Sequence, residues 1–221
     1  MKFRLILMIA IAMMLPGIQA YADDVRELNW DDLKATGFEF EDPFEKLTQD
    51  QLYSLGTVAK YRQQLTSTQK ISESTQAEYD KALAILKTEG VDIDDLLARR
   101  AEITEKRRAR ALTANTELNG KAIRIPGYLL PLEFQDKKVT EFLLVPWVGA
   151  CIHTSPPPAN QIVHVKLDKG FQTDGSLYTS VWVNGVMKTE SNAPELSYVD
   201  GTRKINVSYV MQADEVELYK N

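Results

Sequence analysis

The stretch KAIRIPGYLLPLEFQDKKVTEFLLVPW, residues 121–147, carries the clearest signal of the fold. Two β-like runs, 121–134 and 139–147, flank a polar turn and predict a β-hairpin. Further β-like runs cover residues 160–167, 177–184 and 207–217, and glycines punctuate them. About five strands in about a hundred residues are typical of a small closed or partly open barrel, of which the oligonucleotide/oligosaccharide-binding (OB) type is one.

Upstream of this region the apolar residues recur at helical spacing. The segment TQDQ at 48–51 is a capping-box start, and its helix carries Leu52, Leu55 and Ala59. A second helix is expected from Ser74 or Thr75 to Gly90, and a third from Asp92 or Asp94 to Leu118. The apolar stripes are narrow, which predicts a helical hairpin or bundle with one exposed side.

These patterns predict an α+β protein, with an N-terminal helical hairpin or bundle followed by a small five-stranded OB-like barrel. The segments are an extended arm at 23–47, a helical region at 48–118 and a barrel domain at 119–221. Trp147 and Trp182 are expected to anchor the barrel core.

The first 22 residues predict a cleavable signal peptide. Lys2 and Arg4 precede an apolar run at 5–15, and AYA at 20–22 offers a small-x-small cleavage site. The run is shorter than the roughly 20 residues that a membrane span needs, and no later segment is long and apolar enough. We therefore expect an exported, periplasmic protein that is not an integral membrane protein.

The charge balance restricts the function classes. Lys and Arg number 26 against 31 Asp and Glu, a net charge of -5. This argues against general nucleic-acid binding. The single cysteine, in an oxidising compartment, has no partner for an internal disulfide.

The only cysteine and both histidines lie within fourteen residues, as Cys151, His153 and His164. On an extended chain, Cys151 and His153 point the same way, whereas His164 lies opposite the valines of its own run. One thiolate and two imidazoles suit zinc, or copper in a trigonal site. The sequence thus suggests a metal site, completed by one of Glu133, Glu141, Asp168 or water.

Two other interpretations of this window stay open. It is a structural corner in one, with Cys151 buried and the histidines hydrogen-bonded. In the other, Cys151 is a nucleophile with a histidine base, and Asn160 or Gln161 orients the histidine or polarises a carbonyl. No oxyanion-hole motif, phosphate loop or C-x-x-C accompanies it, so we assign no catalytic residue and expect no enzyme.

The third predicted helix carries a basic stretch. Arg99, Lys106 and Arg110 share one side by spacing. Such a face is usually solvated, but it also suits docking on an acidic partner or on anionic lipid headgroups.

Several motifs resemble the family called domain of unknown function 3299. They are LNGKAIRIPGY at 118–128, FLLVP at 142–146, GACIHTSPPPANQIVHV at 149–165 and, more weakly, LNWDDL at 28–33; Ser155 replaces an expected proline. The resemblance implies a periplasmic OB-type barrel without a settled activity. It also implies a genetic setting beside ATP-driven transporters of the lipoprotein-release or macrolide-export type, sometimes among genes for zinc starvation.

Together these features favour a periplasmic accessory protein of an ABC-transport system. It would bind zinc or another transition metal through Cys151, His153 and His164, and its helices would dock on a membrane component. The alternative is a non-catalytic protein-interaction module in which residues 149–164, here called the Cys/His/Pro window, form a structural corner.

Overall fold

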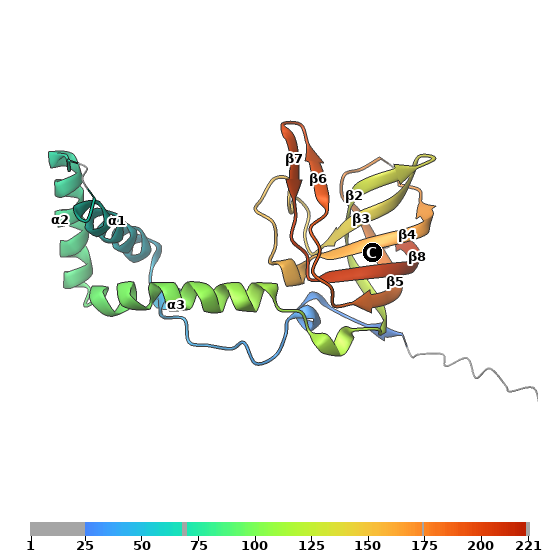
Figure 1. Cartoon of the computed structure of the whole chain (residues 1–221), viewed down its shortest axis with the longest axis horizontal. Helices are drawn as coiled ribbons and strands as arrows, with labels where there is room; N and C mark the ends of the chain where they lie inside the picture. Colours follow the sequence, from blue (N-terminus) through green and yellow to red (C-terminus); the bar gives the residue numbers. More distant parts are fainter. Residues whose placement is uncertain (1–24, 68–69, 174, 220–221) are drawn as a thin grey trace, which may run out of the picture.

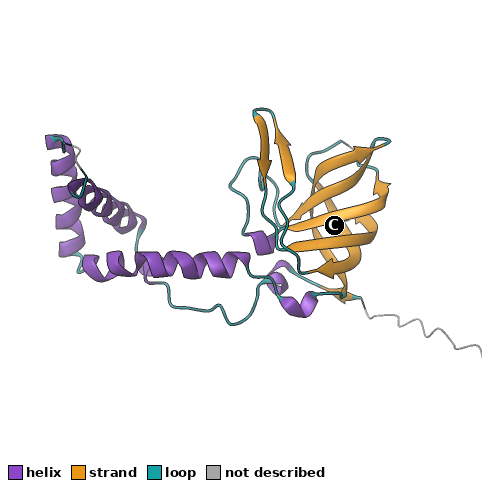
Figure 2. Ribbon diagram, viewed as in Figure 1, coloured by secondary structure: helices purple, strands orange, loops and turns teal. Residues whose placement is uncertain are grey.

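The structure is a computed structural model that describes residues 25–67, 70–173 and 175–219. The predicted signal peptide, 1–22, lies outside the described residues. The described part of the chain combines a β-barrel with three helices that extend away from it (Figures 1 and 2). None of its helices has the length and apolar character needed to cross a membrane.

Five strands close the barrel: β2 (Ala122–Gln135), β3 (Lys138–Val145), β4 (Val163–Phe171), β5 (Thr179–Lys188) and β8 (Tyr209–Leu218). They pair in the order β2-β3-β4-β8-β5, and β5 returns to β2. Only the β4–β8 pair is parallel among these five strands. This Greek-key order is the OB topology, which confirms the predicted fold class.

The first hairpin is tighter than the sequence suggested. Asp136 and Lys137 both adopt positive φ, at 50° and 65°, so two residues join β2 to β3. Two left-handed residues match a type I′ turn, whose twist fits that of the flanking strands.

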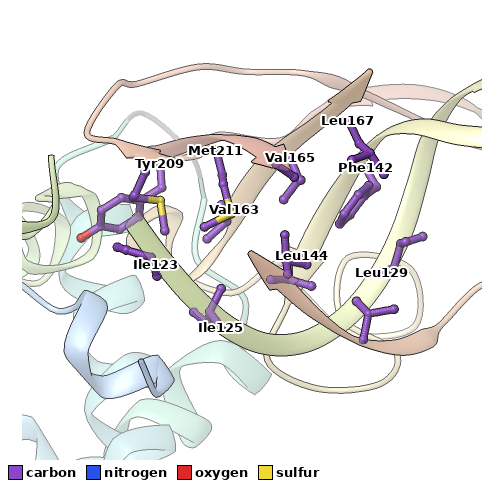
Figure 3. Close-up of a cluster of buried hydrophobic side chains, with 14 of the residues drawn as sticks. Ile123, Ile125, Leu129, Phe142, Leu144, Val163, Val165, Leu167, Tyr209 and Met211 are labelled. Atoms are coloured by element: carbon purple, nitrogen blue, oxygen red, sulfur yellow. The ribbon is translucent and has the colours of Figure 1, made fainter. Parts of the chain in front are cut away.

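The barrel core is built from alternate residues of its strands (Figure 3). On β4, the side chains of Val163, Val165 and Leu167 point inward. His164 points to the other face, as its parity predicted, and is paired with Leu143 of β3. The expectation that Trp147 and Trp182 anchor this core is wrong, since neither belongs to the buried cluster and Trp147 is 44% exposed.

A second hairpin, which sequence reasoning missed, lies between β5 and β8. It consists of β6 (Glu195–Tyr198) and β7 (Gly201–Lys204) and projects from the barrel (Figure 1). Both strands are short, and all four residues of β7 are exposed. Four exposed polar or small residues lack the alternation that identifies a strand.

Helix α1 (Gln49–Leu65) begins at the predicted capping box, with Thr48 as N-cap. Helix α2 (Glu73–Thr88) is capped by Ser72 and packs on α1 as a hairpin. Helix α3 (Ile93–Leu112) leads from this hairpin to the barrel (Figure 1). At 1.5 Å per residue, its 20 residues span about 30 Å.

Helix α3 ends six residues before the predicted boundary. Thr113 turns to an extended conformation, and Ala114 forms an isolated bridge with Lys34. A short 3-10 helix, η3 (Thr116–Leu118), then places Leu118 in the barrel core. The apolar Leu118 therefore belongs to the barrel and does not continue the helix.

The N-terminal arm consists of short elements joined by extended segments. Strand β1 (Arg26–Glu27) runs parallel to β2, and the 3-10 helix η1 (Trp30–Leu33) follows it. The arm then runs beside α3 to a second 3-10 helix, η2 (Pro43–Lys46) (Figure 1).

Candidate functional site

The predicted metal ligands do not converge. Among the residues that the structure describes, no group of three or more His, Cys, Asp or Glu side chains is placed to hold a metal ion. The structure gives Cys151, His153 and His164 three different surroundings, and metal binding by these residues stays a prediction from the sequence.

His164 is buried, with both ring nitrogens already engaged. Its Nε2 lies 2.5 Å from Oε1 of Glu141, and its Nδ1 lies 3.0 Å from the amide nitrogen of Asn192. An amide nitrogen only donates, so Nδ1 accepts the hydrogen bond from Asn192. The ring proton is then on Nε2, which donates a hydrogen bond to the carboxylate of Glu141. No lone pair of this imidazole remains for a metal. The histidine instead ties β4 to the segment that leads into β6.

Cys151 is also buried, in a left-handed backbone conformation with φ of 69°. Burial raises the pKa of its thiol to about 11. A cysteine nucleophile needs a depressed pKa because the thiolate is the reactive form. The surroundings of Cys151 therefore favour an inert thiol over the nucleophile that the sequence left open.

His153 lies at the surface. Its backbone N–H donates to the carbonyl of Gly149 at 2.9 Å and closes the turn around Cys151. No hydrogen bond or ion pair to its ring occurs within the described residues.

A second apolar cluster, here called the outer cluster, covers part of the barrel exterior. Its buried members come from β2, β3, the Cys151 turn, the residue before β4, strand β6 and the segment between β7 and β8: Leu130, Leu143, Val145, Ala150, Cys151, Ile162, Leu196, Ile205 and Val207. Strands β3 and β4 are the second and third of the barrel, whose outer face binds ligands in OB folds. Here that face is occupied, around Leu143 and His164, by the chain's own hairpin and turn.

Asn160, predicted as a binding residue, holds the end of helix α3. Its amide nitrogen donates to the carbonyls of Arg110, at 2.7 Å, and Thr113, at 2.9 Å. The hydroxyl of Ser208 donates to the carbonyl of Leu112 at 2.6 Å. The last carbonyls of a helix lack partners within it, and these two buried side chains supply them.

Gln161 and Tyr209 fix the arm in the same place. The amide of Gln161 donates to the carbonyl of Trp30 at 2.9 Å. The hydroxyl of Tyr209 donates to the carbonyl of Leu33 at 2.6 Å and accepts from the N–H of Asn115 at 2.5 Å. We call Asn160, Gln161, Ser208 and Tyr209 the junction, because they bond the arm and α3 to the barrel.

The junction was only half visible in the sequence. The sequence suggested that Asn160 or Gln161 orients a histidine or polarises a carbonyl, whereas in the structure both amides donate to backbone carbonyls. Ser208 directly precedes β8, and Tyr209 is its first residue. Nothing in the local sequence indicates that their side chains bond segments about 90 to 180 residues away. Their role depends on tertiary contacts alone.

The basic face of α3 is neutralised within the chain. Arg99 pairs with Asp95 at 3.4 Å, Lys106 with Glu102 at 2.6 Å, and Arg110 with Glu45 of the arm at 3.7 Å. Lys106 and Arg110 also lie over the ring of Phe40, 5.8 and 5.0 Å from its centroid. All three predicted docking residues thus have partners inside the molecule, which weakens the idea of a free basic strip.

Arg107 makes the most buried ion pair of this face. Its Nε lies 2.5 Å from Asp42, whose side chain is fully buried. The hydrogen bond from Arg107 lowers the pKa of Asp42, more than burial raises it. This pair binds the arm to α3 along the helix.

The molecule is thus a closed OB-type barrel whose usual ligand face is covered, joined firmly to a helical arm. The family model described as "Protein of unknown function (DUF3299)" matches residues 30–218, so the chain belongs to that family. The crystal structure of a DUF3299 family protein from Pseudomonas aeruginosa PAO1 is 29% identical, covering 89% of this chain and 97% of that one, with a TM-score of 0.46. No curated protein matches the chain significantly.

Proposed function

We propose that this chain is a non-catalytic interaction module, in which the barrel is a base and helix α3 presents the α1–α2 hairpin to a protein partner. One observation carries the proposal. The three buried polar residues of the Cys/His/Pro window, Asn160, Gln161 and His164, all hold parts of the same chain together.

The α1–α2 hairpin offers the surface for such a partner. Two adjoining cavities of about 370 and 420 Å³ lie between the helices, and Tyr53, Thr57 and Glu78 line both. Tyr53 is 77% exposed. The groove mixes apolar side chains such as Leu52 and Ile85 with charged ones such as Lys60 and Glu78. An exposed tyrosine beside such a mixed groove suits contact with an amphipathic helix of a partner.

The proposed location is the periplasm, on the strength of the signal-peptide pattern at 1–22. The proposed partner is a membrane component of an ABC transporter, an idea that rests on the family resemblance. A periplasmic module anchored by its barrel would reach that component with a hairpin about 30 Å away, at the far end of α3.

The competing proposal is zinc carriage by Cys151, His153 and His164. It requires the three side chains to leave their present surroundings. His164 would have to give up Glu141 or Asn192, and the Cys151 thiol would have to leave the outer cluster. Each change breaks buried contacts, so we rank this proposal second.

The partner surface is tested by site-specific photo-crosslinking in cells that produce the protein. A photoreactive phenylalanine analogue replaces Tyr53 in one variant and Gln63, an exposed residue of the same helix outside both cavities, in the control. We expect a discrete adduct from position 53 only. The adduct should disappear when Ile85→Arg, in the lining of the groove, fills it. It should persist in the control Ala84→Arg, which changes an exposed neighbouring residue outside the groove.

Equal labelling from positions 53 and 63, or an adduct indifferent to Ile85→Arg, would contradict the proposal. So would the absence of any adduct from position 53.

A further inference from the structure

Three separate loops are tied together at the end of the barrel that carries the β6–β7 hairpin. The hydroxyl of Tyr178, before β5, donates to the carbonyl of Ala150 at 2.7 Å. The hydroxyl of Tyr198, on β6, donates to the carbonyl of Cys151 at 2.7 Å. The side chains of both tyrosines pack against the outer cluster, so the three loops are held as one unit.

Each loop exposes large apolar side chains within a few residues of these bonds. Trp147 is 44% exposed, Val148 58%, Leu177 55% and Val199 111%. We call these four residues the apolar tip. Val199 lies in the turn between β6 and β7, after the last ladder pair, Tyr198 with Gly201. The hairpin itself projects from the barrel (Figure 1), which explains the high exposure of its turn. The tip is therefore an exposed apolar surface carried by loops, whereas the α1–α2 hairpin offers a groove.

The charge pattern around the tip is unusual for this chain. Charged residues make up 26% of the whole sequence, yet residues 142–165 contain no Asp, Glu, Lys or Arg. On the hairpin, Arg203 pairs with Asp200 at 3.2 Å and covers the ring of Tyr198. Because the Trp147 loop carries no Asp, Glu, Lys or Arg, its transfer into an apolar phase does not require an unpaired ion to lose its water.

We propose that the apolar tip inserts into the interfacial layer of a phospholipid bilayer and holds the barrel on a membrane surface. Tryptophan prefers this layer because its ring is amphipathic, and valine and leucine gain from the acyl boundary. The chain carries a net charge of -5, so attraction to anionic headgroups contributes little. The binding is driven by apolar burial and needs neither the α1–α2 groove nor the proposed protein partner.

The test is flotation of the purified protein, beginning at Asp23, with vesicles of phosphatidylcholine alone and with added phosphatidylglycerol. Removing residues 1–22 keeps the apolar run of the predicted signal peptide from binding lipid itself. We expect binding to both vesicle types that persists in about 0.5 M salt, because added salt weakens only attraction between charges.

Val148→Asp and Val199→Asp should each lower vesicle partitioning about tenfold, equivalent to about 1.4 kcal/mol. The matched control is Leu65→Asp, because Leu65 is 60% exposed at the end of α1, away from the tip. It should bind like the wild type, and circular dichroism should show all three variants folded. Failure of the wild-type protein to float, equal loss in Leu65→Asp, or release by salt would each overturn the proposal. The crosslinking at position 53 is a separate readout, so either idea can fail alone.

Discussion

Replacing Asn160 with Asp tests how helix α3 is attached to the barrel. The native amide nitrogen donates to two carbonyls at the end of α3, those of Arg110 and Thr113. Aspartate has nearly the same shape but has no donor when ionised, and it places negative charge against both carbonyl oxygens. The side chain at this position is 3% exposed, so water cannot replace the lost donors.

The expected cost follows from these contacts. Two hydrogen bonds contribute roughly 0.5–1.5 kcal/mol each, and a buried group left without a partner costs roughly 1–3 kcal/mol. We expect Asn160→Asp to lower the free energy of unfolding by about 3 kcal/mol, and Asn160→Ala by somewhat less. Urea denaturation followed by tryptophan fluorescence measures the change.

The matched control is Gln172→Ala, which removes an exposed amide whose one hydrogen bond among the described residues goes to the neighbouring carbonyl of Thr173. It should change stability by less than about 0.5 kcal/mol, as surface substitutions usually do. If Asn160→Asp were as mild as this control, the amide would not hold the helix end, and our reasoning about the junction would be refuted.

Three further predictions concern the arm, the thiol and the barrel. Because Arg107 lowers the pKa of Asp42, the ionised carboxylate stabilises the fold above its ordinary pKa of 3.8, and this stabilisation is lost as pH falls through the folded-state pKa. Asp42→Asn should remove this acid-dependent loss of stability in urea titrations between about pH 7 and pH 2.5. An unchanged acid profile in the variant would argue against the pairing. With its pKa raised to about 11, the Cys151 thiol should react with iodoacetamide at pH 7.5 at least about tenfold more slowly than in urea-unfolded protein, whereas similar rates would mean that the thiol is accessible. Gly185→Ala should destabilise the barrel by roughly 1–3 kcal/mol in thermal or urea unfolding, because its new Cβ would lie 2.3 Å from the backbone oxygen of Gln212; a neutral effect would show that β5 and β8 can separate easily.

The fold was largely predictable because its signals are local. The capping box at Thr48 marks the start of α1, and the alternation around β4 assigns Val163 and Val165 to the core and His164 to the other face. Each signal depends on residues a few positions apart, where backbone geometry dictates which side chains share a face. The end of α3 was predicted too late because Leu118 fits a helical stripe, although it packs in the barrel.

The candidate site was much less predictable. Closeness in sequence made Cys151, His153 and His164 look like one centre, but the turn at Cys151 and the burial of His164 against Glu141 separate their roles. Asn192, the second partner of His164, lies 28 residues further along the chain. Nothing in the local pattern identifies such a partner, because the contact depends on how the β6–β7 hairpin folds back over the barrel.

The central claim is that the Cys/His/Pro window is a structural corner. Its most direct test is a calorimetric zinc titration of metal-stripped protein beginning at Asp23, with Cys151→Ser measured alongside. Our account predicts no one-to-one binding in either protein at neutral pH. One-to-one binding by the wild type that is lost in Cys151→Ser would contradict it and restore the metal-carrying function.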